Sequence, residues 1–241
     1  MRRRRAIGIF IVGVTAISLL AGAMPRLVQD TLHTSGDIIL PSGASEADPG
    51  SDVGKGLAMH GLEILIVKGH APKTGYSRNQ FGDGWVTLNG CTTREIILYR
   101  DLVDVQLEDA CTIHSGTLHD PYTGKDVVFT RDAASAIQID HVVALSNAWQ
   151  TGAQSLTKEM RIQLANDPLE LLAVDGSANQ QKSDGDSATW LPKNKAFRCE
   201  YIARQIAVKI KYKLWVTKSE ADAMRSVLKT CPSQALPVAR L

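Results

Sequence analysis

Apolar residues recur at helical spacing in several segments of this chain. In residues 57–68 the apolar positions are 57, 58, 62, 65 and 66, which lie on one face of a helix. The same spacing predicts helices over residues 93–105, 157–165 and 195–212. A last helix is expected to open at Ser219-Glu220-Ala221-Asp222, which resembles a capping box.

Short apolar runs between turn residues predict strands. They lie at residues 126–130, 136–144 and 169–174. After the third run, Ser177 is expected to cap a short helix that continues through Asp184. The centre of the chain is therefore predicted as strand, helical insertion, strand, turn and short helix. This α+β order is typical of a ββα-metal nuclease core, here with added helices.

The first residues have the pattern of a secretory signal. Arg2 to Arg5 are basic, residues 6–20 are apolar, and Ala21-Gly22-Ala23 has the small-x-small form of a cleavage site. We predict a signal peptide over residues 1–23 and a secreted protein with no stable membrane association after cleavage. The alternative is an uncleaved N-terminal helix that anchors the protein to the cell envelope.

Composition divides the rest of the chain into a linker, one domain and a tail. Residues 24–55 are rich in Ser, Gly, Asp and Pro, which is typical of a flexible linker. One domain is predicted over residues 56–231, a length that can bury its own core, and residues 232–241 form a C-terminal tail. We expect a monomer, and nothing in the sequence identifies an inhibitor protein.

Removal of the predicted signal peptide changes the net charge of the chain. The full chain has 27 Lys and Arg against 25 Asp and Glu; without Arg2 to Arg5 the count is 23 against 25, a net charge of −2. The mature chain thus lacks an overall basic balance that would indicate a nucleic-acid partner. Residues 193–229, however, hold ten Lys and Arg against three Asp and Glu. This run is either a solvated helical face or a surface that follows phosphates.

The cysteines are four in number: Cys91, Cys111, Cys199 and Cys231. An even number in an exported chain predicts two disulfides, for which three pairings are possible. We favour Cys91 with Cys111 and Cys199 with Cys231, because each pair joins neighbouring elements. The alternative is a zinc site of all four, which the lack of a Cys-x-x-Cys spacing and an oxidising compartment disfavour.

The most complete set of chemical groups is Asp140-His141, followed by Asn179-x-x-Lys182-x-Asp184. Carboxylate and amide oxygens suit Mg²⁺ or Mn²⁺, and a neutral imidazole can take a proton from water. A metal on Asp140 and Asn179 with His141 as base fits phosphodiester hydrolysis. Adjacent strand residues point to opposite faces, so Asp140 and His141 can share one centre only if the strand is bulged or strongly twisted.

These motifs resemble an exported bacterial HNH endonuclease family, which is related to the C-terminal nuclease domain of GmrSD-type restriction enzymes in the His-Me finger superfamily. The resemblance covers roughly residues 76–231 and is carried by Tyr76-Ser77-Arg78, residues 91–95, 116–124, 140–145, 166–176 and 179–184, Trp190-Leu191-Pro192, Cys199 and Cys231. It implies that His141 is the general base and that Asp140 and Asn179 are the metal ligands. It also implies products with 5′-phosphate and 3′-hydroxyl ends.

One motif position departs from the family pattern. The middle position, usually Asn, falls at Glu170, and Asn166 nearby is a second candidate for it. In the family this residue mainly holds the catalytic loop in shape, and an ionised Glu accepts hydrogen bonds without donating them. Lys182 could contact a phosphate or pair with Asp184. Arg94 could clamp a phosphate or lie on the surface.

The sequence therefore predicts an exported HNH endonuclease that depends on Mg²⁺ or Mn²⁺ and cleaves nucleic acid, with DNA favoured over RNA. Low sequence specificity is expected, because the sequence has no evident base-reading module. One rival is a non-catalytic exported nucleic-acid-binding protein in which Glu170 marks a decayed site. Another is an envelope-anchored structural protein that reuses the fold. A zinc protease or serine hydrolase is disfavoured, since neither His-Glu-x-x-His nor Gly-x-Ser-x-Gly occurs.

Overall fold

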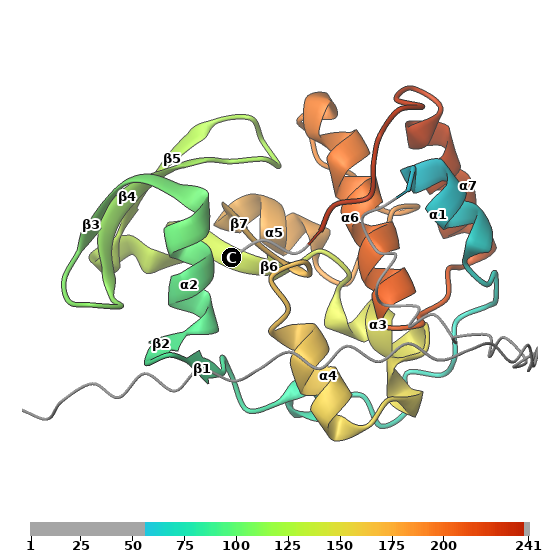
Figure 1. The fold of residues 1–241 in the computed structure, drawn as a ribbon, viewed down its shortest axis with the longest axis horizontal. Helices are drawn as coiled ribbons and strands as arrows, with labels where there is room; N and C mark the ends of the chain where they lie inside the picture. Colours follow the sequence, from blue (N-terminus) through green and yellow to red (C-terminus); the bar gives the residue numbers. More distant parts are fainter. Residues whose placement is uncertain (1–55, 239–241) are drawn as a thin grey trace, which may run out of the picture. The chain divides into compact units, whose positions relative to one another are not determined.

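A computed structural model describes residues 56–238 of the chain (Figure 1). The predicted signal peptide and linker, and residues 239–241 of the predicted tail, lie outside the described residues. The helices are α1 (Ala58–Ile64), α2 (Thr93–Asp101), α3 (Leu145–Gln150), α4 (Lys158–Ala165), α5 (Gly176–Lys182), α6 (Arg198–Lys211) and α7 (Lys218–Leu228). The strands are β1 (Thr87–Leu88), β2 (Cys91–Thr92), β3 (Leu102–Leu107), β4 (Ile113–His119), β5 (Asp126–Thr130), β6 (Ile137–His141) and β7 (Leu171–Asp175). Short 3₁₀ helices lie at η1 (Arg78–Phe81), η2 (Arg131–Ala136), η3 (Ala153–Ser155) and η4 (Lys195–Phe197).

Strands β6 and β7 form an antiparallel pair at the centre of the described residues, and α5 follows β7 directly. The five residue pairs between the two strands run in unbroken register. Asp175 caps α5 by accepting a hydrogen bond from the backbone N–H of Ala178. The predicted order of strand, strand and short helix is confirmed, although the cap is Asp175 and not Ser177. The mixed helix-and-sheet class predicted from the sequence is confirmed as well.

Both faces of the β6–β7 pair are buried, each against a separate hydrophobic core. On one face, Leu172 and Val174 pack with residues of α3, α4, α6 and α7. On the other face, Ile137, Ile139 and Leu171 pack with residues of α2 and of the sheet formed by β3, β4 and β5. Figure 1 shows the pair between these two groups of elements. Because side chains alternate along a strand, each residue of β6 faces one core or the other.

The β3–β4–β5 sheet is antiparallel and packs against α2. The predicted strand at residues 126–130 is β5 and is confirmed. The predicted helix at 93–105 is too long: it ends at Asp101, and the chain continues as β3. Leu102 takes extended backbone angles and pairs with Leu118, because burying it in the sheet outweighs continuing the helical spacing.

Three further helix boundaries differ from the prediction. Helix α1 ends at Ile64, four residues early, and α6 begins at Arg198 after the 3₁₀ turn η4. The capping box of α7 is formed by Thr217 and Glu220, not by a box that begins at Ser219. No helix within residues 56–238 is long and apolar enough to cross a membrane.

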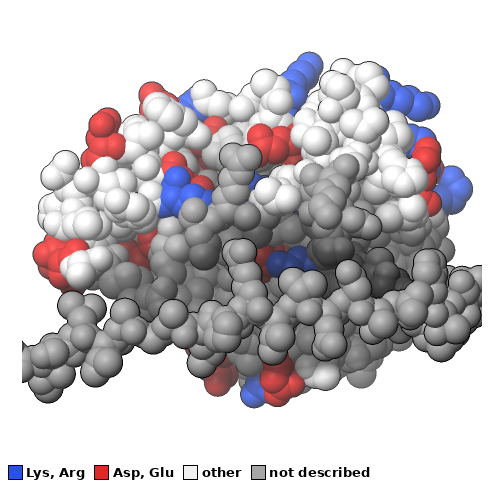
Figure 2. Space-filling model, viewed as in Figure 1, with Lys and Arg blue, Asp and Glu red and all other residues white. Residues whose placement is uncertain are grey.

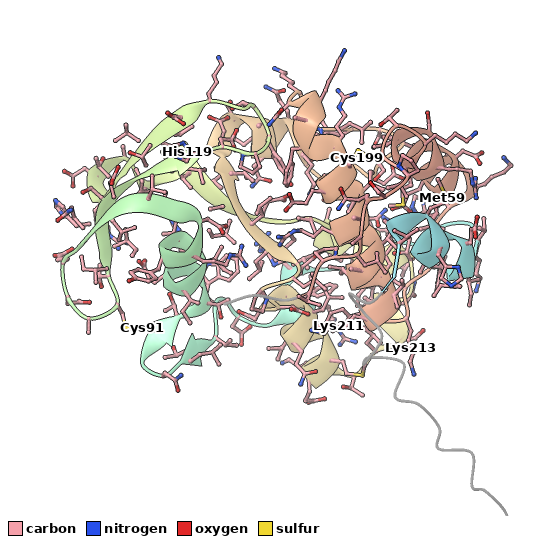
Figure 3. The ribbon with its side chains drawn as sticks, turned by 45° about the horizontal axis from the view of Figure 1, so that its top comes forward. Met59, Cys91, His119, Cys199, Lys211 and Lys213 are labelled. Atoms are coloured by element: carbon pink, nitrogen blue, oxygen red, sulfur yellow. A yellow bond between two sulfur atoms is a disulfide. The ribbon has the colours of Figure 1, made fainter. Side chains whose placement is uncertain are left out.

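The cysteines form the two predicted disulfides, and the described residues contain no free cysteine. The Cys91–Cys111 bond ties the segment just before α2 to the segment just before β4. The Cys199–Cys231 bond ties the start of α6 to the chain just after α7. In Figure 3, Cys91 lies below α2 and Cys199 lies on α6. Each disulfide thus stabilises a different part of the fold.

Candidate active site along strand β6

A cavity of about 770 Å³ follows strand β6, and all five residues of the strand line it. Within its sheet β6 pairs with β7 alone, so the other edge of β6 faces the cavity. The lining residues outside β6 are Tyr76, Arg78, Trp85, Arg94, Ala134, Ser135, Ala144, Leu145, Asn179, Gln180, Ser183 and Asp184. Four predicted site residues therefore meet there: Arg94, Asp140, His141 and Asn179. Glu170 and Lys182 do not line the cavity.

Strand β6 has no bulge between Asp140 and His141, because its register against β7 is regular there. The two side chains point to opposite faces of the pair, as regular strand geometry requires. Both still line the cavity, since it runs along the open edge of β6 and reaches both faces. The open strand edge therefore lets both side chains reach one cavity without a bulge.

His141 ends β6 and is held in one orientation. Its Nε2 lies 3.0 Å from the carbonyl oxygen of Ala165, and because a carbonyl can only accept, Nε2 carries the proton. Nδ1 of the neutral ring is then unprotonated. The indole of Trp85 lies parallel to the imidazole, with ring centroids 5.7 Å apart. Burial lowers the pKa of His141 to about 3, and the positive charges of Arg78 and Lys182 act in the same direction.

Asp140 lies on the opposite face of β6, where α5 and Tyr122 hold both of its carboxylate oxygens. Oδ1 accepts a hydrogen bond from Nζ of Lys182 at 2.9 Å, and Oδ2 accepts one from the hydroxyl of Tyr122. Lys182 also donates to the backbone carbonyl of His141 at 2.8 Å. The ammonium group thus fixes the side chain of one β6 residue and the backbone of the next.

Both expectations for Lys182 are therefore wrong. Its side chain is fully buried, so its ammonium group is not exposed for a contact with a phosphate. It does not pair with Asp184, which instead forms an exposed ion pair with Lys73 at 2.8 Å. The physical reason is that α5 ends at Lys182 and Ser183 takes a positive φ of 48°, so the chain changes direction before Asp184. We interpret Lys182 as a positioning residue.

Asn179 lies on α5 and faces the same side of β6 as Asp140. Its Nδ2 donates a hydrogen bond to Oε1 of Gln138 at 2.9 Å, which fixes the amide and leaves its carbonyl oxygen for another partner. The described residues contain no group of three or more His, Cys, Asp and Glu side chains arranged to hold a metal ion. Mg²⁺ does not require such a group, because it is often held by one or two carboxylates and several waters. One carboxylate and one amide oxygen at the same cavity fit a largely hydrated divalent cation.

Glu170 and not Asn166 contacts the chain that follows His141. Glu170 is completely buried; its backbone carbonyl accepts from the N–H of Val142, and its Oε2 accepts from the N–H of Val143. Asn166 instead binds the backbone of Val86 and of its own helix. Burial raises the pKa of Glu170 well above its usual value, which favours the neutral carboxyl group. A neutral carboxyl can both donate and accept, as the amide of Asn does.

Two arginines bring positive charge to the cavity. Arg94 projects from α2; one of its terminal guanidinium nitrogens is buried and has no hydrogen-bond partner among the described residues. Burial lowers the pKa of Arg94, yet a guanidinium keeps its charge. Arg78 lines the same cavity from η1. The sequence analysis did not propose Arg78 or Trp85, although the family resemblance included Tyr76-Ser77-Arg78. Glu95 has a structural contact: it pairs with Arg131 at 3.1 Å.

The basic run at residues 193–229 does not form a continuous cationic surface. Lys209 is buried against Glu220, and Lys211 pairs with Asp167 at 2.6 Å. Lys211 lies at the end of α6 in Figure 3, and Lys218 pairs with Asp222 on α7. On the described part of the face in Figure 2, basic and acidic groups are interspersed. The run therefore favours the solvated-face interpretation.

Comparisons with known proteins agree with the chemistry of this cavity. The family model of the C-terminal domain of GmrSD restriction endonucleases matches residues 94–227. An "Uncharacterized secreted protein" of Arthroderma benhamiae is 42% identical over 173 residues, which cover 70% of this chain and 82% of that protein. The prediction of secretion is confirmed by this relative. A bacterial origin, which the resemblance implied, is not shown. No solved structure matches the chain significantly.

Proposed function

The chain belongs to the family of GmrSD restriction endonuclease C-terminal domains, which indicates a nuclease-like domain that acts on nucleic acid; we propose that it is a metal-dependent endonuclease with His141 as its general base. The observation that carries this proposal is the arrangement of His141. Its tautomer is set by Ala165, and it shares one cavity with Asp140, Asn179 and Arg94.

Hydrolysis begins with a water molecule that attacks phosphorus in line with the leaving oxygen. The unprotonated Nδ1 of His141 takes a proton from this water, while Nε2 stays on the carbonyl of Ala165. The lowered pKa keeps the imidazole neutral at physiological pH but makes it a weak base in the free protein. A bound phosphodiester brings a negative charge that favours the imidazolium, so binding of the substrate strengthens the base.

Charge on the phosphate oxygens needs positive partners, and the cavity offers two. The guanidinium group of Arg94, which lines the cavity, would bind a non-bridging oxygen, and Arg78 would bind the neighbouring phosphate. Restriction endonuclease families typically use divalent metals. When bound by Asp140 and Asn179, Mg²⁺ or Mn²⁺ would supply Lewis-acid stabilisation of the phosphate and the leaving oxygen. We expect cleavage of DNA with low sequence specificity, leaving 5′-phosphate and 3′-hydroxyl ends.

Nicking of supercoiled plasmid tests the proposal. The purified secreted form would be assayed with Mg²⁺, with Mn²⁺ and with chelator, beside His141→Ala. Because general bases typically contribute about 10²–10⁴-fold, we expect at least a hundredfold loss in His141→Ala and no nicking with chelator. The matched control is His119→Ala, since His119 is an exposed histidine on β4 that pairs with Asp126.

The alternative is a nucleic-acid-binding protein with a decayed site. Plasmid that stays intact with every metal, while the folded and oxidised protein still binds DNA, would favour that alternative. Nicking that is unchanged in His141→Ala would keep the nuclease and exclude His141 as its base.

A further inference from the structure

A second cavity, of about 400 Å³, adjoins the cavity along β6. The two cavities share four lining residues: Arg78, Trp85, His141 and Leu145. The wall between them is therefore formed by the proposed base, by the indole parallel to it and by one arginine. A ligand at His141 has direct access to both cavities. Volumes of this size lie within the range of about 300–1,000 Å³ that is usual for small-molecule sites.

The second cavity is less charged than the first, although Arg78, Asn79 and Asp83 line part of it. Phe81, Leu145 and Ala165 line it beside the indole of Trp85. Its outer rim is the turn Gly82-Asp83-Gly84, and a Cβ at Gly84 would meet no atom within 4 Å, so this rim is open. Arg78 is the one Lys or Arg among the described residues that line it. An aromatic, mostly apolar recess beside a charged one suits a nucleobase rather than a phosphate.

Trp85 has the position of a stacking residue. It is partly exposed and lines both cavities, and its ring is parallel to that of His141, with an interplanar angle of 6°. In a nucleic acid, a base is separated from its own phosphate by one sugar. A phosphate at Nδ1 of His141 therefore places a neighbouring base near the indole of Trp85.

We propose that the second cavity holds the unpaired base of a nucleotide next to the scissile phosphate, stacked on Trp85. This inference rests on the proposed nuclease function and specifies its substrate: single-stranded or locally unpaired nucleic acid. A base enclosed by Phe81, Leu145 and Ala165 cannot remain paired, and removing it from a duplex costs a few kcal/mol. A strand that is already unpaired avoids this cost.

The distribution of charge supports the same substrate. Binding to duplex relies on many phosphate contacts, each supplied by Lys or Arg. Among the described residues that line the two cavities, only Arg78 and Arg94 are basic. Stacking compensates for sparse charge in proteins that bind single strands, because every base has an aromatic face.

Binding measured with chelator tests the inference without cleavage. The probe is a short fluorescent single-stranded oligonucleotide, alone or annealed to its complement, and the readout is anisotropy. We expect the wild type to bind the single strand more tightly than the duplex. Trp85→Ala should weaken single-strand binding about 5- to 150-fold, the effect of losing one stacked base. Trp85→Phe should keep most of the affinity, because it keeps an aromatic face.

The control variant is Trp215→Ala, which removes another partly exposed indole away from both cavities. Thermal melting checks that each variant is folded. If Trp85→Ala does not fold, Trp85→Phe is used for the test instead. The stacking site is overturned if a folded Trp85→Ala binds the single strand as tightly as the wild type does. It is also overturned if Trp85→Phe binds as weakly as Trp85→Ala. Equal binding of duplex by the wild type overturns it as well. If plasmid nicking persists in these cases, the nuclease proposal stands; if the wild type neither binds nor nicks, both fail.

Discussion

The cavity side of the molecule and its helical side are stabilised by the same two devices, a buried lysine–carboxylate pair and a disulfide. On the helical side, Lys209 donates to three acceptors, Glu220, Asn147 and the carbonyl of Trp215, and both members of the ion pair are sealed from solvent. On the cavity side, Lys182 is equally buried, but its partner Asp140 lines the cavity.

The difference shows how one kind of contact serves two purposes. Glu220 also accepts from the backbone of Thr217 in the capping box, so its contacts all lie within the fold. Asp140 has the edge of a cavity beside it, and its lysine also holds the backbone of His141. A sealed pair connects helices, whereas a pair at a cavity orients groups for a ligand.

The largest effect is expected for Lys209→Met. The substitution leaves Glu220 as a buried, unpaired charge, which typically costs about 3–5 kcal/mol of unfolding free energy. Urea unfolding at neutral pH measures it, and the double variant Lys209→Met/Glu220→Gln should recover part of the loss. A cost under about 1 kcal/mol would show that water reaches this pair and would remove the distinction.

Removing either disulfide should cost about 2–4 kcal/mol, because the closed loops of 20 and 32 residues are of similar length. The activities should differ. Cys91→Ala/Cys111→Ala loosens the start of α2, which carries Arg94, so nicking should fall even at temperatures where the variant is folded. Cys199→Ala/Cys231→Ala should retain its activity below its melting temperature. Equal activity in the two folded variants would contradict a role for α2 in the site.

Lys182→Met should have a smaller effect on stability and a larger one on activity. Water in the cavity can solvate Asp140, so we expect a loss of about 1–3 kcal/mol, less than for Lys209→Met. Nicking should fall at least about tenfold, since the lysine contacts to Asp140 and to the His141 carbonyl are then lost. Titration with Mg²⁺ adds a readout specific to positioning: the metal dependence should change in Lys182→Met and stay unchanged in Lys209→Met.

The effect of histidine protonation on stability should be confined to the cavity side, because His141 is the only buried histidine among the described residues. Its pKa is about 3 in the folded state against 6.5 for a free imidazole. Above pH 6.5 the ring is neutral in both states and adds no pH dependence. As pH falls from 6.5 towards 3, the unfolded chain takes up the proton first, so this group lowers stability by about 1.4 kcal/mol per pH unit. The part of the slope of unfolding free energy against pH that His141 contributes should be absent in His141→Asn. Unfolding in the presence of chelator measures it.

The smallest effect is expected for Glu170→Gln. The neutral carboxyl and the amide have nearly the same shape, and both can accept from Val143, so stability near pH 4.5 should change by less than about 1 kcal/mol. Glu170→Ala is the contrasting variant, because it loses that hydrogen bond and leaves a void. Because the folded-state pKa is raised, the wild type loses stability as pH rises above the ordinary value of 4.5, so Glu170→Gln should gain relative to the wild type from that pH upward. A large loss in Glu170→Gln would mean that the carboxyl is ionised.

Much of the fold around the site follows from local sequence patterns. The short runs that became β5, β6 and β7 lie between turn residues, and the order β6, β7, α5 could be predicted from them. The boundary between α2 and β3 could not, because the apolar residues after Asp101 satisfy helical spacing as well as strand alternation. Packing of Leu102 against β4 decides between the two, and that contact is between segments distant in the chain.

The candidate site divides in the same way. Asp140, His141 and Asn179 could be proposed from a motif, because their spacing follows the strand and the helix that carry them. Arg78 and Trp85 lie about sixty residues before His141, on a 3₁₀ turn and a loop with no periodicity, and only folding brings them to the cavity. The partner of Lys182 could not be predicted for a related reason. Asp184 is close to Lys182 in sequence, but α5 ends at Lys182 and the chain changes direction before Asp184.

The open edge of β6 also bears on self-association of the protein. An edge strand presents unpaired backbone groups that can template pairing with another chain, and natural proteins guard such edges with charged side chains. Here the charged side chains beside the open edge are Arg78 and Arg94, which also line the cavity. A variant inactivated by neutralising these charges would therefore expose the strand edge and be prone to aggregate. A variant inactivated by substitution of His141 would keep the charges beside the edge.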